Sequence, residues 1–171
     1  AVNGAGFRTV KPTKAVDFTG RLSVNYQGFS VGIGGYRGKL GKETSSGIAR
    51  TTNLLNVALG YKTKVYSLGA EYFTIKNQKG ILFTNLADKA NGFSVFGAYR
   101  PLDKWSVFAR YDQSKTSKLI RPASKETYYH AGVQYSPTQI VDFGLVYKRD
   151  KKDLASLSKS NEVGFYGQFR F

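Results

Sequence analysis

Apolar and polar residues alternate along almost the whole chain with a period of two, and aromatic residues stand at the ends of the apolar sets. Between Val16 and Gln27, every second residue from Val16 is apolar or glycine, and every residue between them is polar. This period is that of a β-strand with one apolar face, and no helical period competes with it. The pattern predicts an all-β, antiparallel chain with strands at 16–27, 29–36, 55–62, 66–73, 93–100, 105–112, 128–135, 141–148 and 162–171.

The placement of the aromatic residues decides between kinds of β protein. A soluble barrel or sandwich also alternates, but its apolar face closes a core. Here the apolar sets begin or end in rings, as with Tyr66 and Tyr72 or Trp105 and Tyr111. Rings at both ends of an apolar band, in segments of about 10 residues, are typical of the girdles of a transmembrane barrel. The sequence therefore predicts an integral, multi-pass β-barrel of the bacterial outer membrane.

The connections between these strands alternate in length. Short ones lie at 27–28, 62–64, 100–104 and 136–139, and long ones at 3–14, 37–51, 76–91, 113–126 and 149–161. Outer-membrane barrels have short periplasmic turns and long outside loops. The alternation predicts that every long connection lies outside the cell.

The strand count is odd, whereas bacterial single-chain barrels have even numbers of strands. Nine or ten strands would also enclose an interior that side chains fill. We therefore expect residues 1–171 to form a single β-barrel segment, the C-terminal portion of a larger barrel. The alternative is a small complete outer-membrane barrel with a structural, adhesive or lipid-processing role.

Composition excludes several kinds of site. The chain has no Cys and one His, which excludes a disulfide framework, a cysteine-ligated metal and a multi-His metal site, so we expect no cofactor and no metal. The net charge of +15 favours nucleic acid or an anionic membrane as a partner. The aromatic residues lie on apolar faces and most basic residues lie in the long connections, so they do not form the stacking platforms of a nucleic-acid binder.

Ionisable residues on the polar faces are the candidates for a pore lining, because a wet lumen tolerates charges that lipid does not. Rings of Lys and Arg favour anions, whereas facing charges of opposite sign would only brace the wall. The alternation predicts these lining residues: Arg21, Lys62, Glu71, Arg100, Arg110, Asp112, His130, Lys148 and Arg170.

The long connections carry most of the net positive charge. We expect this charge at the outer mouth, where it attracts anionic solutes or pairs with the phosphates of lipopolysaccharide. The alternative is plain solubility of exposed loops. The basic outer mouth is predicted to include Arg37, Lys39, Lys42, Lys115, Lys118, Arg121, Lys151 and Lys152.

An enzymatic role rests on one residue. His130 is the only histidine that could serve as a general base, and Ser106, Ser117 and Asp112 are its candidate partners. No nucleophile motif surrounds either serine. The sequence therefore favours a channel over an enzyme.

Several stretches of the chain resemble the C-terminal half of Gram-negative outer-membrane porins of the phosphate-selective porin group. The resembling stretches are NGAGF at 3–7, GGYRGKLGK at 34–42, LGAEYF at 68–73, DKANGFSVFGAY at 88–99, VFARYDQSKTSK at 107–118, VDFGLVYKRDK at 141–151 and NEVGFYGQFRF at 161–171. The resemblance implies a porin barrel of about 16–18 strands, usually trimeric, that forms a water-filled channel for passive diffusion of small hydrophilic solutes. The basic residues of the polar faces and the outer mouth lead us to expect a preference for anions. The resemblance also implies that Phe171 is the C-terminal aromatic presented to the insertion machinery.

Overall fold

The computed structural model describes residues 16–39, 51–77, 87–153 and 157–170, and these form one antiparallel sheet of nine strands in chain order. No residue in these ranges is helical, so none of them forms a helix that could cross a membrane. The strands are β1 (Phe18–Tyr26), β2 (Phe29–Gly38), β3 (Thr52–Lys62), β4 (Tyr66–Lys76), β5 (Lys89–Leu102), β6 (Trp105–Lys115), β7 (Lys125–Tyr135), β8 (Val141–Asp153) and β9 (Leu157–Phe169).

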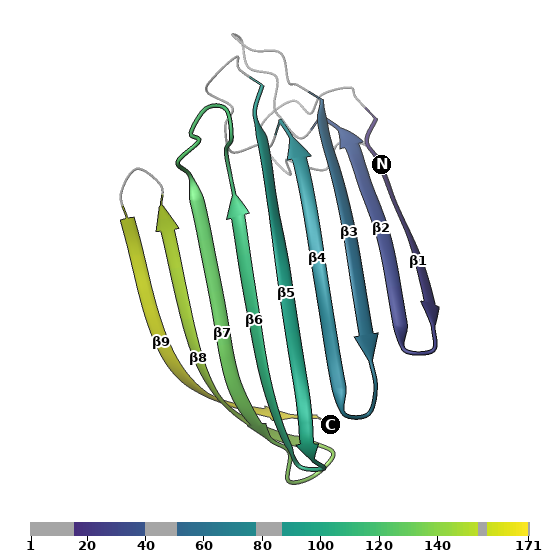
Figure 1. Cartoon of the computed structure of the whole chain (residues 1–171), viewed down its shortest axis with the longest axis vertical. Coiled ribbons are helices and arrows are strands. Elements are labelled where there is room, and N and C mark those ends of the chain that lie inside the picture. Colours follow the sequence, from purple (N-terminus) through teal and green to yellow (C-terminus); the bar gives the residue numbers. More distant parts are fainter. Residues whose placement is uncertain (1–15, 40–50, 78–86, 154–156, 171) are drawn as a thin grey trace.

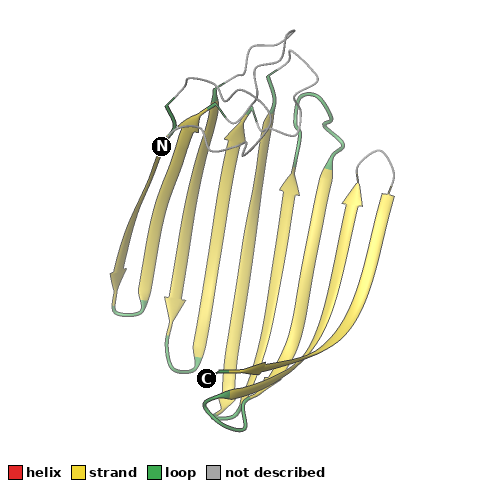
Figure 2. Cartoon of the chain, turned by 180° about the vertical axis from the view of Figure 1, so that it is seen from behind, coloured by secondary structure: helices red, strands yellow, loops and turns green. Residues whose placement is uncertain are grey.

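The strands form a meander in which each strand pairs with the next along the chain (Figure 1). Short turns lie at one end of the sheet, and the longer β6–β7 connection lies at the other (Figure 2). We call these the inner and the outer end. Within the described residues the sheet is open, with β1 and β9 as its edges. All-β architecture, antiparallel pairing and the number of strands are confirmed.

The turn between β1 and β2 shows how the sequence sets the register at the inner end. Gln27 and Gly28 both have positive φ, 45° and 85°, as a two-residue hairpin turn of type I′ requires. Tyr26 and Phe29 are therefore directly opposite each other. The backbone N–H of Lys62 donates to the carbonyl of Gly28 at 2.8 Å, so β3 pairs with the turn itself.

The two faces of the sheet differ from those of a soluble protein. The apolar face is open, with Phe18 68%, Val163 70% and Phe165 72% exposed. The only buried apolar side chains among the described residues, Ile75, Ala90 and Val146, lie on the polar face. Water-exposed apolar surface of this extent requires an apolar partner.

Aromatic side chains form two belts on the apolar face. At the inner end, ring pairs span neighbouring strands: Phe29–Tyr61 at 4.5 Å, Tyr66–Tyr99 at 5.1 Å, Trp105–Tyr135 at 4.7 Å and Phe143–Phe165 at 5.9 Å between centroids. Nearer the outer end, the pairs are Phe93–Tyr111 at 5.9 Å and Tyr129–Tyr147 at 5.6 Å. Amphipathic rings at two levels mark the two interfaces of a bilayer.

The strands are longer at their outer ends than the sequence pattern predicts. The apolar alternation fades there, but backbone pairing continues, from Asn53↔Lys76 in β3–β4 to Lys152↔Ser158 in β8–β9. Arg149, Lys151 and Lys152 consequently lie in β8 and not in a loop. Arg37 and Lys115 likewise lie in β2 and β6. The predicted loops at 37–51, 76–91, 113–126 and 149–161 are too long, because pairing needs no apolar side chains above the membrane.

Candidate pore-lining face and outer rim

Strand alternation and register place every predicted lining residue on one side of the sheet, the polar face. Arg110, His130, Lys148 and Glu162 are directly opposite one another on β6, β7, β8 and β9. Other members lie farther along the same face, at Arg21 in β1, Lys62 in β3, Glu71 in β4, and Arg100 and Asp112 in β5 and β6. That this face lines a pore stays a prediction.

Most of these side chains bind one another. Arg110 Nε donates to both carboxylate oxygens of Asp112 at 2.9 Å, although the two side chains are 44% and 28% exposed. Lys148 binds Glu162 at 3.2 Å and also contacts the hydroxyl of Tyr166, which donates to Glu162 at 2.8 Å. Exposed pairs of this kind contribute little to stability, about 0–1 kcal/mol each. These ion pairs nevertheless leave hydrated charges on the polar face.

His130 packs among rings and is flanked by cations. Its ring lies 5.9 Å from Phe108 and 5.6 Å from Tyr128, and its Nδ1 is buried without a hydrogen-bond partner. Ser117 donates its hydroxyl proton to Asp88 and accepts from the backbone of Arg121 at 2.8 Å. Ser106 pairs with Gln134 and not with His130. The structure therefore does not bring His130, a serine and Asp112 together as a catalytic triad.

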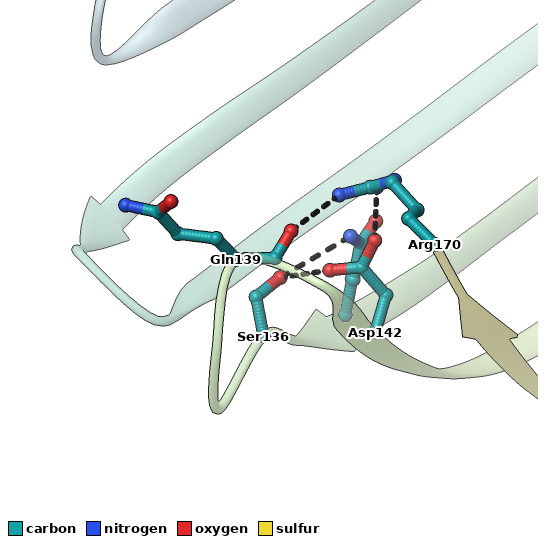
Figure 3. Close-up of polar contacts among 5 residues, drawn as sticks. Ser136, Gln139, Asp142 and Arg170 are labelled. Atoms are coloured by element: carbon teal, nitrogen blue, oxygen red, sulfur yellow. Dashed lines mark hydrogen bonds and ion pairs between the residues drawn. The ribbon is translucent and has the colours of Figure 1, made fainter.

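At the inner end, Arg170 is fixed to the start of β8 (Figure 3). Its guanidinium binds the carboxylate of Asp142 and donates to the carbonyl of Gln139 at 3.1 Å. Ser136 donates to the other oxygen of Asp142 at 2.5 Å. These bonds join the last described residue to the β7–β8 turn, so Arg170 acts first as a brace.

A depression of about 420 Å³ lies on the polar face toward the outer end. Four acidic and two basic side chains line it, together with Ser94 and Tyr128 from β5 and β7. The charged lining residues are Glu71, Asp112, Glu126, Asp150, Arg110 and Lys152. This part of the face is locally acidic.

Within the nine strands, basic and acidic residues on the polar face are equal in number, with six of each. The basic ones are Arg21, Lys62, Arg100, Arg110, Lys148 and Lys152, and the acidic ones are Glu71, Asp112, Glu126, Asp142, Asp150 and Glu162. The positive excess of the chain therefore does not lie on this face of the described strands.

The residues predicted for the basic outer mouth are dispersed. Arg37, Lys115 and Lys151 are in register with the apolar face. Lys152 is on the polar face and binds Asp150 at 3.2 Å. Lys118 and Arg121 are in the β6–β7 connection, and the backbone of Lys39 donates to Asp17 at 3.0 Å. Lys42 lies outside the described residues.

Sequence reasoning missed a hydrogen-bond network at the outer rim. Asp88, 3% exposed, accepts from the hydroxyl of Ser117 and from the backbone N–H groups of Lys89 at 2.7 Å, Lys118 at 3.1 Å and Leu119 at 2.9 Å. Its own carbonyl accepts from Asn77 at 2.8 Å. Burial acts to raise the pKa of Asp88, but the four hydrogen bonds outweigh it and the net pKa is lowered. No pattern in the sequence marked Asp88, because the predicted strand began at Phe93 and Asp88 fell within a long connection.

Comparison with known protein families agrees with the fold described above. A family model described as Gram-negative porin matches residues 3–155. No curated protein sequence matches the chain at a significant level.

Solved structures with similar folds are outer-membrane proteins. The channel DcaP of Acinetobacter baumannii is 18% identical over 98% of this chain and 56% of its own, with a TM-score of 0.72. OmpT, an outer membrane protein of Vibrio cholerae, is 16% identical over 92% of this chain and 56% of its own, with a TM-score of 0.66. A refined porin structure is 14% identical over 91% and 51%, with a TM-score of 0.66. The chain thus spans about half the length of these proteins.

Proposed function

The chain belongs to the Gram-negative porin family, and from that premise we propose that its strands form part of the wall of a water-filled channel for passive diffusion of small hydrophilic solutes. The protein is an integral β-barrel protein of the outer membrane. The family and the fold favour a channel over an enzyme.

One observation supports the channel most directly, namely the separation of chemistry between the two faces. Apolar side chains such as Leu22, Val95 and Leu145 are exposed on one face, while paired, partly exposed charges such as Arg110 and Asp112 are on the other. Lipid tolerates the first face and water the second, because a Lys or Arg facing lipid at mid-bilayer costs about 2–4 kcal/mol.

We propose that the complete wall contains more strands than the nine described. The free backbone groups at the edges of β1 and β9 have no water to bind inside a bilayer, so further strands must pair with them. Nine strands would also close around an interior filled by side chains, whereas aqueous channels need about 16–18.

We propose that the barrel is a homotrimer. A depression of about 740 Å³ on the apolar face is floored by Gly97, Ala109 and Ala131, which are directly opposite one another on β5, β6 and β7. Tyr66, Tyr99 and Tyr147 border it. Small residues let two barrel walls approach closely within a bilayer.

We propose that the channel prefers anions and that this preference comes from charge at the outer end and not from the wall. The polar face is balanced in charge, while the chain as a whole carries +15. The field of distant surface charge extends about 30 Å at 10 mM salt and only about 3 Å at 1 M salt. The preference should therefore depend strongly on salt.

Single-channel recording of the protein isolated at full length from the outer membrane tests these proposals together. We expect insertion in units of three equal conductance steps, and a reversal potential that indicates anions at about 10 mM salt and shrinks toward zero at about 1 M. Absence of an ion current would contradict the channel, and a cation preference at low salt would contradict the role of the outer charge.

A further inference from the structure

Three rings on the polar face form a continuous run along β7. The imidazole ring of His130 lies 5.6 Å from the ring of Tyr128 and 5.9 Å from the ring of Phe108, in edge-to-face contact with both. Phe108 belongs to β6, but its ring lies over Gly132, which is the next residue of β7 on this face. We call Tyr128, His130 and Phe108 the ring track. It covers three successive same-face positions of β7 and therefore extends about 13 Å along the strand.

The ring track joins two depressions of the polar face. Tyr128 lines the depression of about 420 Å³ toward the outer end. Phe108 lines a second depression, of about 370 Å³, which Arg100 and Gln134 border at the inner end. His130 lies between the two rings. A solute that moved along this part of the wall from one depression to the other would therefore pass over the ring track.

The ring of Phe108 lies along the wall and does not project into the lumen, because Gly132 has no side chain to hold it away. An aromatic ring in this position offers a flat apolar surface on a face that is otherwise polar. Such a surface gains nothing from water, so a solute that packs an apolar face against it is favoured there.

The charged groups beside the ring track are paired with one another. Arg110 and Lys148 are directly opposite His130, one on each side. Arg110 binds Asp112 at 2.9 Å, and Lys148 binds Glu162 at 3.2 Å. Each pair places a donor beside an acceptor without a net charge. A hydroxyl group fits such a pair, because it can both donate and accept a hydrogen bond.

A flat apolar surface between paired donors and acceptors matches the chemistry of a sugar. The C–H groups of a sugar ring form an apolar face that packs on an aromatic ring, and its hydroxyl groups lie around the edge. A small anion would gain nothing from the rings and would meet the carboxylates of Asp112 and Glu162 beside the cations. A wholly apolar solute would leave the ion pairs unused.

We propose that the ring track binds neutral sugars on their way along the wall, with a sugar face against Phe108 or Tyr128 and hydroxyl groups on the pairs Arg110–Asp112 and Lys148–Glu162. The proposal rests on the channel function proposed above and names a substrate class for it. It agrees with an anion preference that comes from the outer end, because the ring track carries no net charge of its own.

The test measures binding of the neutral trisaccharide maltotriose to the full-length protein, in a detergent without a sugar headgroup. Saturation-transfer NMR, with irradiation of the aromatic protons of the protein, detects sugar protons that lie against rings and does not depend on ion flow. F108L and Y128L each replace one ring of the track by a non-planar apolar side chain. F96L is the matched control, because the ring of Phe96 is on the same face but lies over Gly69 of β4, away from β7.

We expect F108L and Y128L to bind maltotriose about three- to ten-fold more weakly than the parent protein, as the loss of one ring contact implies. F96L should bind it like the parent protein. Equal binding by the parent protein and both track variants, or an equal loss in F96L, would overturn the proposal. Glucuronate that binds the parent protein much more tightly than glucose would overturn the choice of a neutral sugar.

A second arm separates this proposal from the channel itself. Maltotriose should reduce the single-channel current of the parent protein and of F96L at concentrations that barely affect F108L, and a polyethylene glycol of similar mass should not. An ion current without saturation transfer would reject the ring track as a sugar site and leave the channel in place. Saturation transfer without an ion current would support the sugar site and contradict the channel.

Discussion

At the scale of single residues, Asp88 shows how one carboxylate can hold an outer connection in place. It stands just before β5, yet the Ser117 hydroxyl and the N–H groups of Lys118 and Leu119 that bind it belong to the β6–β7 connection. Hydrogen bonds to a charged group contribute roughly 1.5–3 kcal/mol each when buried. The connection is therefore expected to be ordered by the charge of Asp88 and not by an apolar core.

Replacing that carboxylate should open the connection without unfolding the barrel. In D88N the amide group can place N–H against the N–H groups of Lys118 and Leu119, and the charge is lost. We expect trypsin to cleave after Lys118 about ten- to a hundred-fold faster, as the loss of one to three kcal/mol implies (about 1.4 kcal/mol per tenfold). D103N, in the β5–β6 turn at the inner end, is the control and should be cleaved at the parent rate.

The hydrogen bonds to Asp88 also predict how the order of the β6–β7 connection changes with pH. Because the folded pKa of Asp88 is lowered, its stabilising contribution is present above the ordinary carboxyl pKa and is lost as the pH falls through the lowered value. Amide exchange at residues 117–121, corrected for its intrinsic rate, should therefore be slow near about pH 7 and fast near about pH 2. In D88N it should be fast at both, and a pH-dependent protection that survives in D88N would contradict this role.

At the scale of strands, rings on the polar face cover glycines of neighbouring strands. Phe108 of β6 lies over Gly132 of β7, and Phe73 of β4 lies over Gly92 of β5. A methyl group added at Gly132 would meet both Phe108 Cζ and the carbonyl oxygen of Leu145 at 2.7 Å. A backbone oxygen cannot move aside without breaking the β7–β8 pairing.

We therefore expect G132A to destabilise the barrel by about 1–3 kcal/mol, the usual effect of overpacking. The measurement is the urea midpoint of unfolding, followed by tryptophan fluorescence and by the heat-induced shift in gel mobility. G20A is the matched strand control, since a methyl group there meets nothing within 4 Å. A midpoint for G132A equal to that of G20A would contradict the packing described.

The inner ends at which strands begin could be predicted residue by residue, whereas β5 runs to Leu102, two residues past its predicted end, and the outer ends could not be predicted. Phe29, Tyr66, Trp105 and Val141 begin strands where the alternation begins, because short turns and an aromatic belt coincide there. At the outer ends, the side facing out changes from apolar to basic, as at Lys151, while pairing continues. Periodicity of hydropathy reports the membrane-facing part of a strand and not its full length.

The candidate pore-lining face also has features that the sequence predicts and features that it does not. The shared face of Arg110, His130 and Lys148 follows from parity, since alternation fixes the side on which a strand residue lies. The binding of Arg110 to Asp112 and the burial of Asp88 depend on side-chain geometry across loops and strands, which a linear pattern does not carry. Lys152 could not be placed from the sequence, because its position on the polar face depends on β8 extending to Asp153, beyond the predicted end of that strand.

At the scale of the whole molecule, charge is separated by direction. The polar face is balanced, whereas the outward side at the outer end is strongly basic. On the proposed channel function, the wall of the lumen is of mixed sign, and the net charge of +15 is not carried by that wall.

The central claim is that one face of this sheet meets water inside the membrane and the other meets lipid, and adjacent cysteines test it most directly. The chain has no native cysteine, and Ser94 and Val95 are neighbours in β5 on opposite faces. We predict that a charged, membrane-impermeant thiol reagent modifies S94C in the intact outer membrane and lowers its single-channel current, while V95C stays unmodified. Modification of V95C at the rate of S94C, or an unreactive S94C, would contradict the account.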